Sequence, residues 1–192
     1  MAQTDLNGLR VAILITDGFE EVEMTEPRKA LDEAGAITSV VSPKEDGRVR
    51  AWKFTDWGDA YPVDVQLARA QAQDFDALLL PGGVINPDKL RMLPPAVAFV
   101  RAFFEAEKPV AAICHGPWTV IEADAARGRR IASWPSLKTD LRNAGAEWVD
   151  QEVVVDRNLV SSRKPDDIPA FNREMIRRFS SARDEQKLRR AS

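Results

Sequence analysis

The sequence predicts an α/β fold in which a mainly parallel central sheet is covered by helices on both faces. Short, continuous apolar runs, typical of strands buried on both sides, alternate with helical segments; the clearest runs span residues 9–15, 75–80 and 109–113. The 192 residues, 44% apolar and 30% charged, suit one domain with an adequate core. We therefore expect a single domain over residues 1–192, with its core at about 8–180.

The first half of the chain supplies the following elements. A strand over 9–15 precedes a helix over 26–34, which crosses Pro27 near its start and ends at Gly35, where glycine favours a helix stop. Residues 37–42 form a second strand. A strand or hairpin within 50–54 and the buried strand 75–80 complete this half.

The second half continues the alternation. The apolar face formed by Val97, Val100, Phe103 and Phe104 predicts an amphipathic helix over 95–107. The elements expected after it are a strand over 110–113, a helix from 117 to about 126, a strand near 130–133, a short helix over 138–143, a hairpin over 152–162 that turns at 157–158, and a helix over 167–179. Residues 181–192 lack an apolar face, so we expect a frayed tail.

The only cysteine and the only histidine are adjacent, at Cys114 and His115. A lone cysteine is more often a small core residue. Here, however, an apolar strand ends at Cys114, Gly116 permits a tight turn, and Pro117 is typical of a helix start. A strand-to-helix turn would place the sulfur near the positive end of a helix, which favours the thiolate, and would aim the His115 amide at an oxyanion.

Two other loops are expected at the same edge of the sheet. Gly82 and Gly83 follow the strand 75–80; they either turn the chain or bring backbone N–H groups close to a ligand as oxyanion donors. Glu20 follows the first strand, whereas the helix macrodipole accounts for the acids at 21 and 23. Ligands of parallel sheets collect at the carboxyl ends of strands, so these loops converge with Cys114.

Composition limits the partners. The 27 basic and 30 acidic residues give a net charge of −3, so no basic field attracts nucleic acid, and the basic groups at 127–130 and 187–190 are typical of solvated surface. Neither a membrane span nor a signal peptide is recognisable, so a cytoplasmic location is expected. One cysteine and one histidine cannot form a zinc site in one subunit, and nucleotide-binding glycine motifs are absent; we expect no metal and no cofactor.

Four blocks of the sequence resemble the DJ-1/PfpI family, particularly its PfpI branch. They are Asp-Gly-Phe-Glu-Glu-Val-Glu at 17–23, Leu-Pro-Gly-Gly at 80–83, Ala-Ile-Cys-His-Gly-Pro at 112–117 and Ser-Ser-Arg at 161–163. The resemblance covers about residues 8–180. It implies a flavodoxin-like three-layer sandwich, similar to class I glutamine amidotransferases, that assembles as a homodimer or larger homo-oligomer.

The resemblance also implies roles for individual residues. Cys114 matches the family nucleophile, and His115 matches the histidine that follows it in the PfpI branch. Glu20 matches the glutamate that hydrogen-bonds the sulfur. Asp88 is similar to an acidic residue that a neighbouring subunit brings to the histidine; in one chain it is equally typical of an acid in the first turn of a helix.

The activities implied by the resemblance share one step, the attack of a soft nucleophile on a carbonyl carbon. We expect a stress-protective hydrolase or lyase of deglycase or cofactor-independent glyoxalase type. It would act on small reactive aldehydes or their glycation adducts, with Cys114 attacking and His115 moving protons. The alternatives are a PfpI-type intracellular cysteine peptidase and a redox-sensing or chaperone-like stress protein that uses Cys114 oxidation. Amidotransferases need a second, downstream histidine, which this chain lacks.

Overall fold

The central sheet has seven strands, all parallel except one at its edge. The structure, a computed structural model, describes the backbone of residues 5–191 and the side chains of 5–183. The strand order is β11-β12-β8-β7-β1-β3-β6, and only β11 runs antiparallel, to β12. The bounds are β1 (Arg10–Leu14), β3 (Ile37–Ser42), β6 (Val65–Gln66), β7 (Ala77–Leu80), β8 (Val110–Ile113), β11 (Val153–Asp156) and β12 (Leu159–Ser162).

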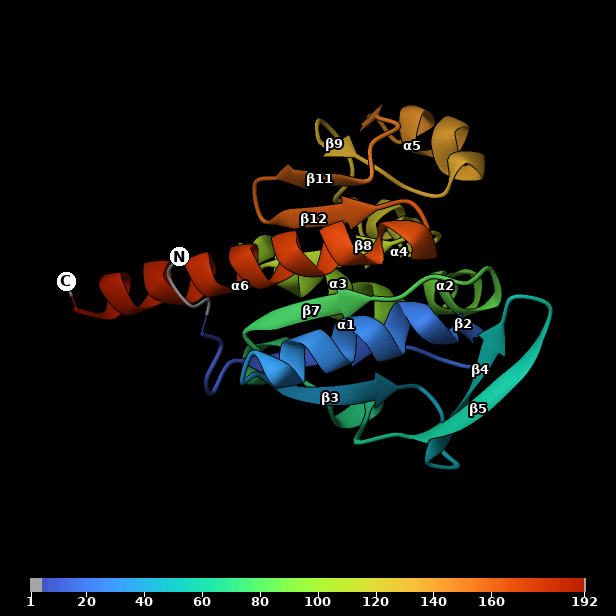
Figure 1. Cartoon of the computed structure of the whole chain (residues 1–192), viewed down its shortest axis with the longest axis horizontal. Helices are drawn as coiled ribbons and strands as arrows, with labels where there is room; N and C mark the ends of the chain where they lie inside the picture. Colours follow the sequence, from blue (N-terminus) through green and yellow to red (C-terminus); the bar gives the residue numbers. More distant parts are fainter. Residues whose placement is uncertain (1–4, 192) are drawn as a thin grey trace.

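Helices cover both faces of this sheet (Figure 1). One face packs against α1 (Glu21–Glu33) and α6 (Ile168–Ala191). The other packs against α3 (Pro94–Glu105), α4 (Pro117–Glu122) and the short α2 (Ile85–Arg91). This is the expected three-layer α/β sandwich.

Alternation along each strand divides the core into two clusters. In β1, Val11 and Ile13 join the α1–α6 side, whereas Ala12 and Leu14 join the opposite side. All four side chains are fully buried. The continuous apolar runs therefore arise because successive side chains enter different cores.

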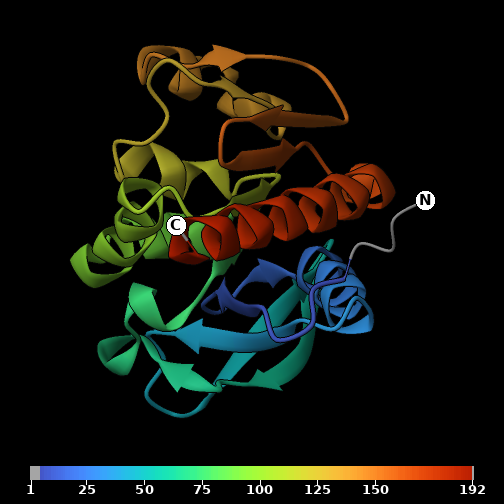
Figure 2. The same ribbon diagram turned by 90° about the vertical axis from the view of Figure 1, so that its left-hand side faces the viewer.

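Smaller elements extend the two ends of the sheet, as Figure 2 shows from the side. The three-stranded sheet contains β2 (Phe19–Glu20), β4 (Arg48–Lys53) and β5 (Asp56–Pro62). The other end carries β9 (Arg130–Ile131), β10 (Glu147–Trp148) and α5 (Lys138–Asn143). Short 3₁₀ helices lie at η1 (Leu67–Arg69), η2 (Ala72–Asp74), η3 (Pro135–Leu137) and η4 (Pro165–Asp167).

Several boundaries differ from the sequence-based expectation, among them the ends of α4 at Glu122 instead of about 126 and of β9 at Ile131 instead of 133. The first helix begins at Glu21, so Pro27 lies inside it. The segment after the glycine pair, for which no element is expected, forms α2. The last helix continues to Ala191, so the expected frayed tail is helical as far as the structure describes it; its Ala, Arg, Glu, Gln and Lys residues have high helix propensity, which does not require an apolar face.

The topology locates the candidate site. From β1 the chain crosses to β3 on one side and then returns to β7 on the other. The strand order reverses at this point, and in open parallel sheets ligands bind beyond the carboxyl ends of such strands. The loops after β1, β7 and β8 meet there.

Candidate active site

Cys114 lies in a tight turn directly after β8. Its φ is 62°, in the left-handed region that residues other than glycine rarely adopt. Backbone hydrogen bonds hold the turn: Cys114 N–H donates to Ser162 O (3.0 Å), Trp134 N–H donates to Cys114 O (2.9 Å), and Gly116 N–H donates to Ile113 O (2.9 Å). The expected strand-to-helix turn is present, and strain of this kind is typical of functional positions.

The glycine loop after β7 approaches Cys114 so closely that a larger residue would not fit. A Cβ on Gly82 would lie 2.6 Å from Cys114 Cβ, and one on Gly83, whose φ is 74°, would lie 2.6 Å from a carbonyl oxygen of the loop after β1. Gly82 N–H donates to Glu23 Oε2 at 3.0 Å. The N–H groups of Gly83 and His115 act on the Cys114 sulfur and favour its thiolate, and Gly83 N–H also acts on the Glu23 carboxylate. Of the three expected oxyanion donors, Gly82 is thus already engaged by a side chain.

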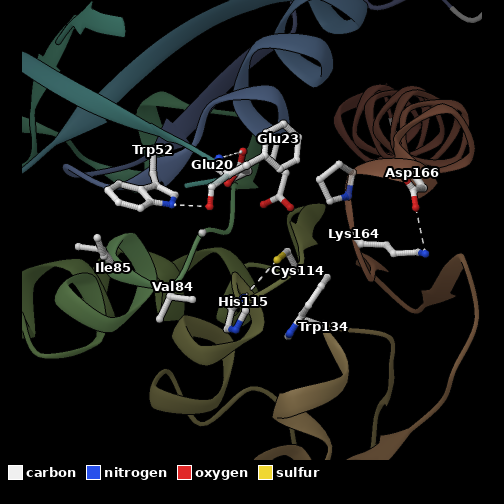
Figure 3. A pocket seen from close by; sticks show the side chains of 13 residues that line it. Glu20, Glu23, Trp52, Val84, Ile85, Cys114, His115, Trp134, Lys164 and Asp166 are labelled. Carbon is white, nitrogen blue, oxygen red and sulfur yellow. Dashed lines mark hydrogen bonds and ion pairs between the residues drawn. The ribbon is translucent and has the colours of Figure 1, made fainter. Parts of the chain in front are cut away.

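The glutamate beside the sulfur is Glu23, not Glu20. The Glu23 side chain is fully buried, points toward Cys114 (Figure 3) and forms a hydrogen bond with it. Its Oε1 has no nitrogen or oxygen partner within residues 5–183. Glu20 lines the same pocket, but its Oε1 accepts the Phe54 N–H at 3.3 Å. Because α1 begins at Glu21, Glu23 occupies the first helical turn, whereas Glu20 precedes the helix and faces the β4–β5 hairpin.

Glu23 and Cys114 form a coupled acidic pair. Burial raises the pKa of Glu23 to about 8 and raises the pKa of the Cys114 thiol well above its ordinary value, because the charged forms lose water. The negative charge of Glu23 also raises the pKa of Cys114, whereas the hydrogen bond with Cys114 lowers the pKa of Glu23 and the nearby Glu20 raises it. The lowered thiol pKa expected at a helix start is therefore wrong for the resting pocket: burial outweighs the backbone donors, and α4 has only six residues. The two groups therefore release their protons as a coupled pair, and a charge on Glu23 opposes a charge on the sulfur.

His115 stands between the sulfur and two tryptophans. Its Nδ1 lies 3.2 Å from Cys114 Sγ, and its Nε2 lies 3.4 Å from Ser136 Oγ. The imidazole contacts Trp118 edge-on at 5.1 Å between ring centroids and lies nearly parallel to Trp134 at 6.0 Å. Burial lowers the pKa of His115 to about 4, so near neutral pH the ring is uncharged and can accept a proton from the thiol at Nδ1 or pass one on.

Asp88 is not part of this cluster within one chain. It lies in the first turn of α2, is exposed, and lines a separate surface depression with Arg91, Met92 and Glu122. The hydrogen-bond partner of His115 Nε2 inside the described chain is the Ser136 hydroxyl instead.

The pocket above Cys114 measures about 630 Å³, and aromatic side chains form part of its wall. Trp52 and Phe54 come from the β4–β5 hairpin, Trp134 from the loop after β9, and Lys164 from the start of η4 (Figure 3). Lys164 pairs with Asp166 at 3.0 Å. The remaining lining residues are Glu20, Glu23, Gly83, Val84, Ile85, Cys114, His115 and Pro165.

Sequence reasoning did not single out Glu23, Ser136 or the aromatic walls as parts of the site. The sequence contained one usable signal: the acids at 21 and 23 are typical of a first helical turn, and a helix that starts at Glu21 contains Glu23 but not Glu20. Across residues 5–183, the structure contains no group of three or more His, Cys, Asp or Glu side chains able to hold a metal ion. No helix within the described residues is long and apolar enough to cross a membrane.

Comparisons with known proteins agree with this geometry. Residues 9–178 match the DJ-1/PfpI family. A Bacillus subtilis protein named as a cysteine protease, YraA, is 45% identical over 167 residues, which cover 87% of this chain and 96% of that protein. Protein/nucleic acid deglycase 2 of Escherichia coli is 45% identical over 170 residues, covering 88% and 96%.

Among solved structures, a two-domain protein from Anabaena variabilis with DJ-1/ThiJ/PfpI-like and ferritin-like domains has a TM-score of 0.83 and 36% identity. The match covers 88% of this chain and 48% of that one, so this chain spans about half of the two-domain protein.

Proposed function

The chain belongs to the DJ-1/PfpI family, and on that premise we propose that it is a stress-protective cysteine hydrolase or lyase acting on reactive aldehydes or their glycation adducts. The observation that carries the proposal is Cys114, held in a strained turn with its sulfur 3.2 Å from His115 Nδ1 and against the buried Glu23. A nucleophile beside a proton acceptor, with backbone donors around it, is the arrangement that addition to a carbonyl requires.

The first step needs only groups of this chain. The thiol proton passes to His115 Nδ1, the sulfur forms a bond to the carbonyl carbon, and the C=O π pair moves to oxygen. The oxyanion is stabilised by the N–H groups of Gly83 and His115, which already face the sulfur. Protonation of that oxygen by the imidazolium gives a thiohemiacetal, and no external oxidant or reductant is consumed.

The pocket favours a small substrate group. Its volume of about 630 Å³ fits an aldehyde or the modified end of an adduct, and flat walls at Trp52, Phe54 and Trp134 suit a planar group such as a guanidine or a base. These features support a deglycase or glyoxalase. A PfpI-type peptidase is the alternative that the name of the YraA relative favours.

We further propose that the site is completed in an oligomer. Asp88 is exposed on α2, beside the strongly exposed Met92 and the partly exposed Leu93. An apolar surface next to an acid is a plausible contact for a second copy of the chain, which would bring Asp88 to the His115 of its neighbour.

The test compares the wild type with Cys114→Ser in an amine-free buffer, because amines consume methylglyoxal. We expect methylglyoxal loss, or release of free peptide from a purified methylglyoxal–arginine adduct, to fall at least about 100-fold in the variant. Equal rates in the two proteins would exclude Cys114 chemistry.

One further condition separates the activities. With excess aminoguanidine present to trap free aldehyde, a glyoxalase adds nothing to adduct breakdown, whereas a deglycase still accelerates it. Cleavage of unmodified fluorogenic peptides by the wild type, without either aldehyde activity, would identify the peptidase instead.

A further inference from the structure

We propose that Asn86 is a positioning residue that aligns the two backbone amides next to Cys114 and Glu23. It lies in the first turn of α2, its side chain is 0% exposed, and it belongs to none of the catalytic groups named above. Its role in catalysis rests on the proposed function of Cys114, whereas its effect on the thiol does not.

The Asn86 amide joins two of the loops that build the site. Its Oδ1 accepts the N–H of Thr16, in the loop after β1, at 2.8 Å. Its Nδ2 donates to Pro81 O at 3.0 Å and to Gly82 O at 3.3 Å, both in the loop after β7. A fully buried side chain that makes three hydrogen bonds to backbone groups fixes those groups in space.

The carbonyls that Asn86 holds belong to the peptide units that present the important N–H groups. A trans peptide is planar, with its C=O and N–H pointing in opposite directions. The unit of Pro81 O therefore carries the Gly82 N–H, which donates to Glu23 Oε2 at 3.0 Å. The unit of Gly82 O carries the Gly83 N–H, which acts on the Cys114 sulfur.

Glycine makes this alignment necessary. Gly82 and Gly83 lack a Cβ, and Gly83 has a φ of 74°, so the backbone by itself resists rotation of these peptide units weakly. The Glu20 N–H also contacts Gly82 O, at a longer 3.4 Å. Asn86 thus restrains both units from one point, and loss of its Nδ2 donors frees the Gly83 N–H to turn away from the sulfur.

The test is Asn86→Asp, which keeps an acceptor for Thr16 N–H but, when ionised, has no donor for the two carbonyls. We expect kcat to fall about 10- to 100-fold with KM changed less than about threefold, because a misaligned donor acts on the transition state. The pH midpoint of Cys114 alkylation by iodoacetamide should move upward, because the Gly83 N–H that favours the thiolate is displaced.

Asn158→Asp is the matched control. Asn158 is also buried, and its Nδ2 donates to Lys108 O at 2.7 Å. It lies in the β11–β12 turn, however, next to the amino end of β8, whereas Cys114 follows the carboxyl end of that strand. This variant should leave both kcat and the alkylation profile unchanged, even if Tm shifts. Should N86D not fold, the uncharged and smaller N86S is measured in the same two ways.

A wild-type kcat and alkylation profile in the Asn86 variant would overturn the proposal. If the wild type shows no turnover of any aldehyde or adduct, the alkylation profile alone decides. An upward shift in N86D but not in N158D then supports the positioning role while the proposed enzymatic function fails.

Discussion

The pairing of Glu23 with Cys114 sets the charge of the site. Both groups are buried, and burial raises the pKa of each, so the pocket accepts one negative charge more readily than two. Gly82 N–H stabilises that charge on the carboxylate, His115 N–H stabilises it on sulfur, and Gly83 N–H acts on both groups. The nucleophile is therefore controlled by where one proton resides.

Glu23→Gln should change the pH dependence of stability. The folded-state pKa of Glu23 is about 8 against an ordinary 4.5, so the folded protein holds this proton more tightly than the unfolded chain. Its contribution is complete below about pH 4.5 and is lost as pH rises toward 8. We expect the Tm of the variant to exceed that of the wild type by a margin that grows between pH 5 and 8, corresponding to about 1–3 kcal/mol at pH 8. A pH-independent Tm difference would contradict the buried, protonated carboxyl.

The two glutamates should also differ in their effect on activity. Glu23→Gln replaces the buried carboxyl beside the sulfur with an amide, and the altered hydrogen bonds around the nucleophile should lower kcat about 100-fold or more. Glu20→Gln keeps an oxygen that can accept the Phe54 N–H, and its kcat should stay within about threefold of wild type. Steady-state kinetics on the same adduct measure both; the reverse ranking would restore Glu20 as the partner of the sulfur.

The β4–β5 hairpin is the element that shapes the pocket entrance. It carries Trp52 and Phe54, and the Trp52 Nε1–H donates to Phe54 O at 3.0 Å. Phe54 is 67% exposed and has a φ of 56°. An exposed aromatic residue in a strained backbone conformation is more readily explained by contact with a ligand or partner than by packing in the fold.

Phe54→Gly separates these effects. Glycine adopts the positive φ without strain, so the hairpin should keep its conformation while the pocket loses one aromatic wall. We expect KM to rise about 3- to 10-fold with kcat within about twofold, because this wall would bind the substrate and the transition state equally well. Ile37→Ala, which removes another exposed apolar side chain, 57% exposed at the start of β3, should change neither constant. An unchanged KM in the Phe54 variant would exclude this wall from substrate binding.

The elements differ in how well the sequence predicted them, for physical reasons. The strands at 37–42 and 110–113 match β3 and β8: the second is a short apolar run, and the first is rich in β-branched residues and bounded by Gly35 and Pro43. The β4–β5 hairpin was uncertain because β5 has no buried residue, so its sequence shows no apolar alternation. The macrodipole explains an acid at 23 without giving it a partner, and this general explanation hid that Glu23, in the first turn of α1, faces the sulfur.

The arrangement of the whole sheet explains why the position of Cys114 could be predicted from the sequence, whereas the side chains around it could not. Two apolar cores on either side of one sheet require the strands that the sequence predicts, and the carboxyl ends of those strands fix the position of Cys114. The direction of a side chain such as Ser136 or Asn86 depends on contacts between distant loops, which periodicity does not encode. A contact between two copies of the chain, such as the one proposed at Asp88, is likewise not encoded in the periodicity of the sequence.

Mixing of subunits tests whether Asp88 acts on a neighbouring chain. Asp88→Asn should lose activity, since the histidine lacks its acid, and Cys114→Ser should lose the nucleophile. Neither dead protein alone should regain activity on dilution and reassociation. Their 1:1 mixture, however, should recover roughly a quarter of wild-type activity if subunits assort randomly in a two-fold dimer, because each mixed dimer contains one site with both residues.

The control mixes Cys114→Ser with Glu23→Gln, which are both defective within the same chain's site, and this mixture should stay inactive. Recovery only with Asp88→Asn, together with a dimer or larger species by sedimentation, would place the acid in the partner subunit. A fully active Asp88→Asn protein, or a monomer with full activity, would instead leave Ser136 as the group that orients His115.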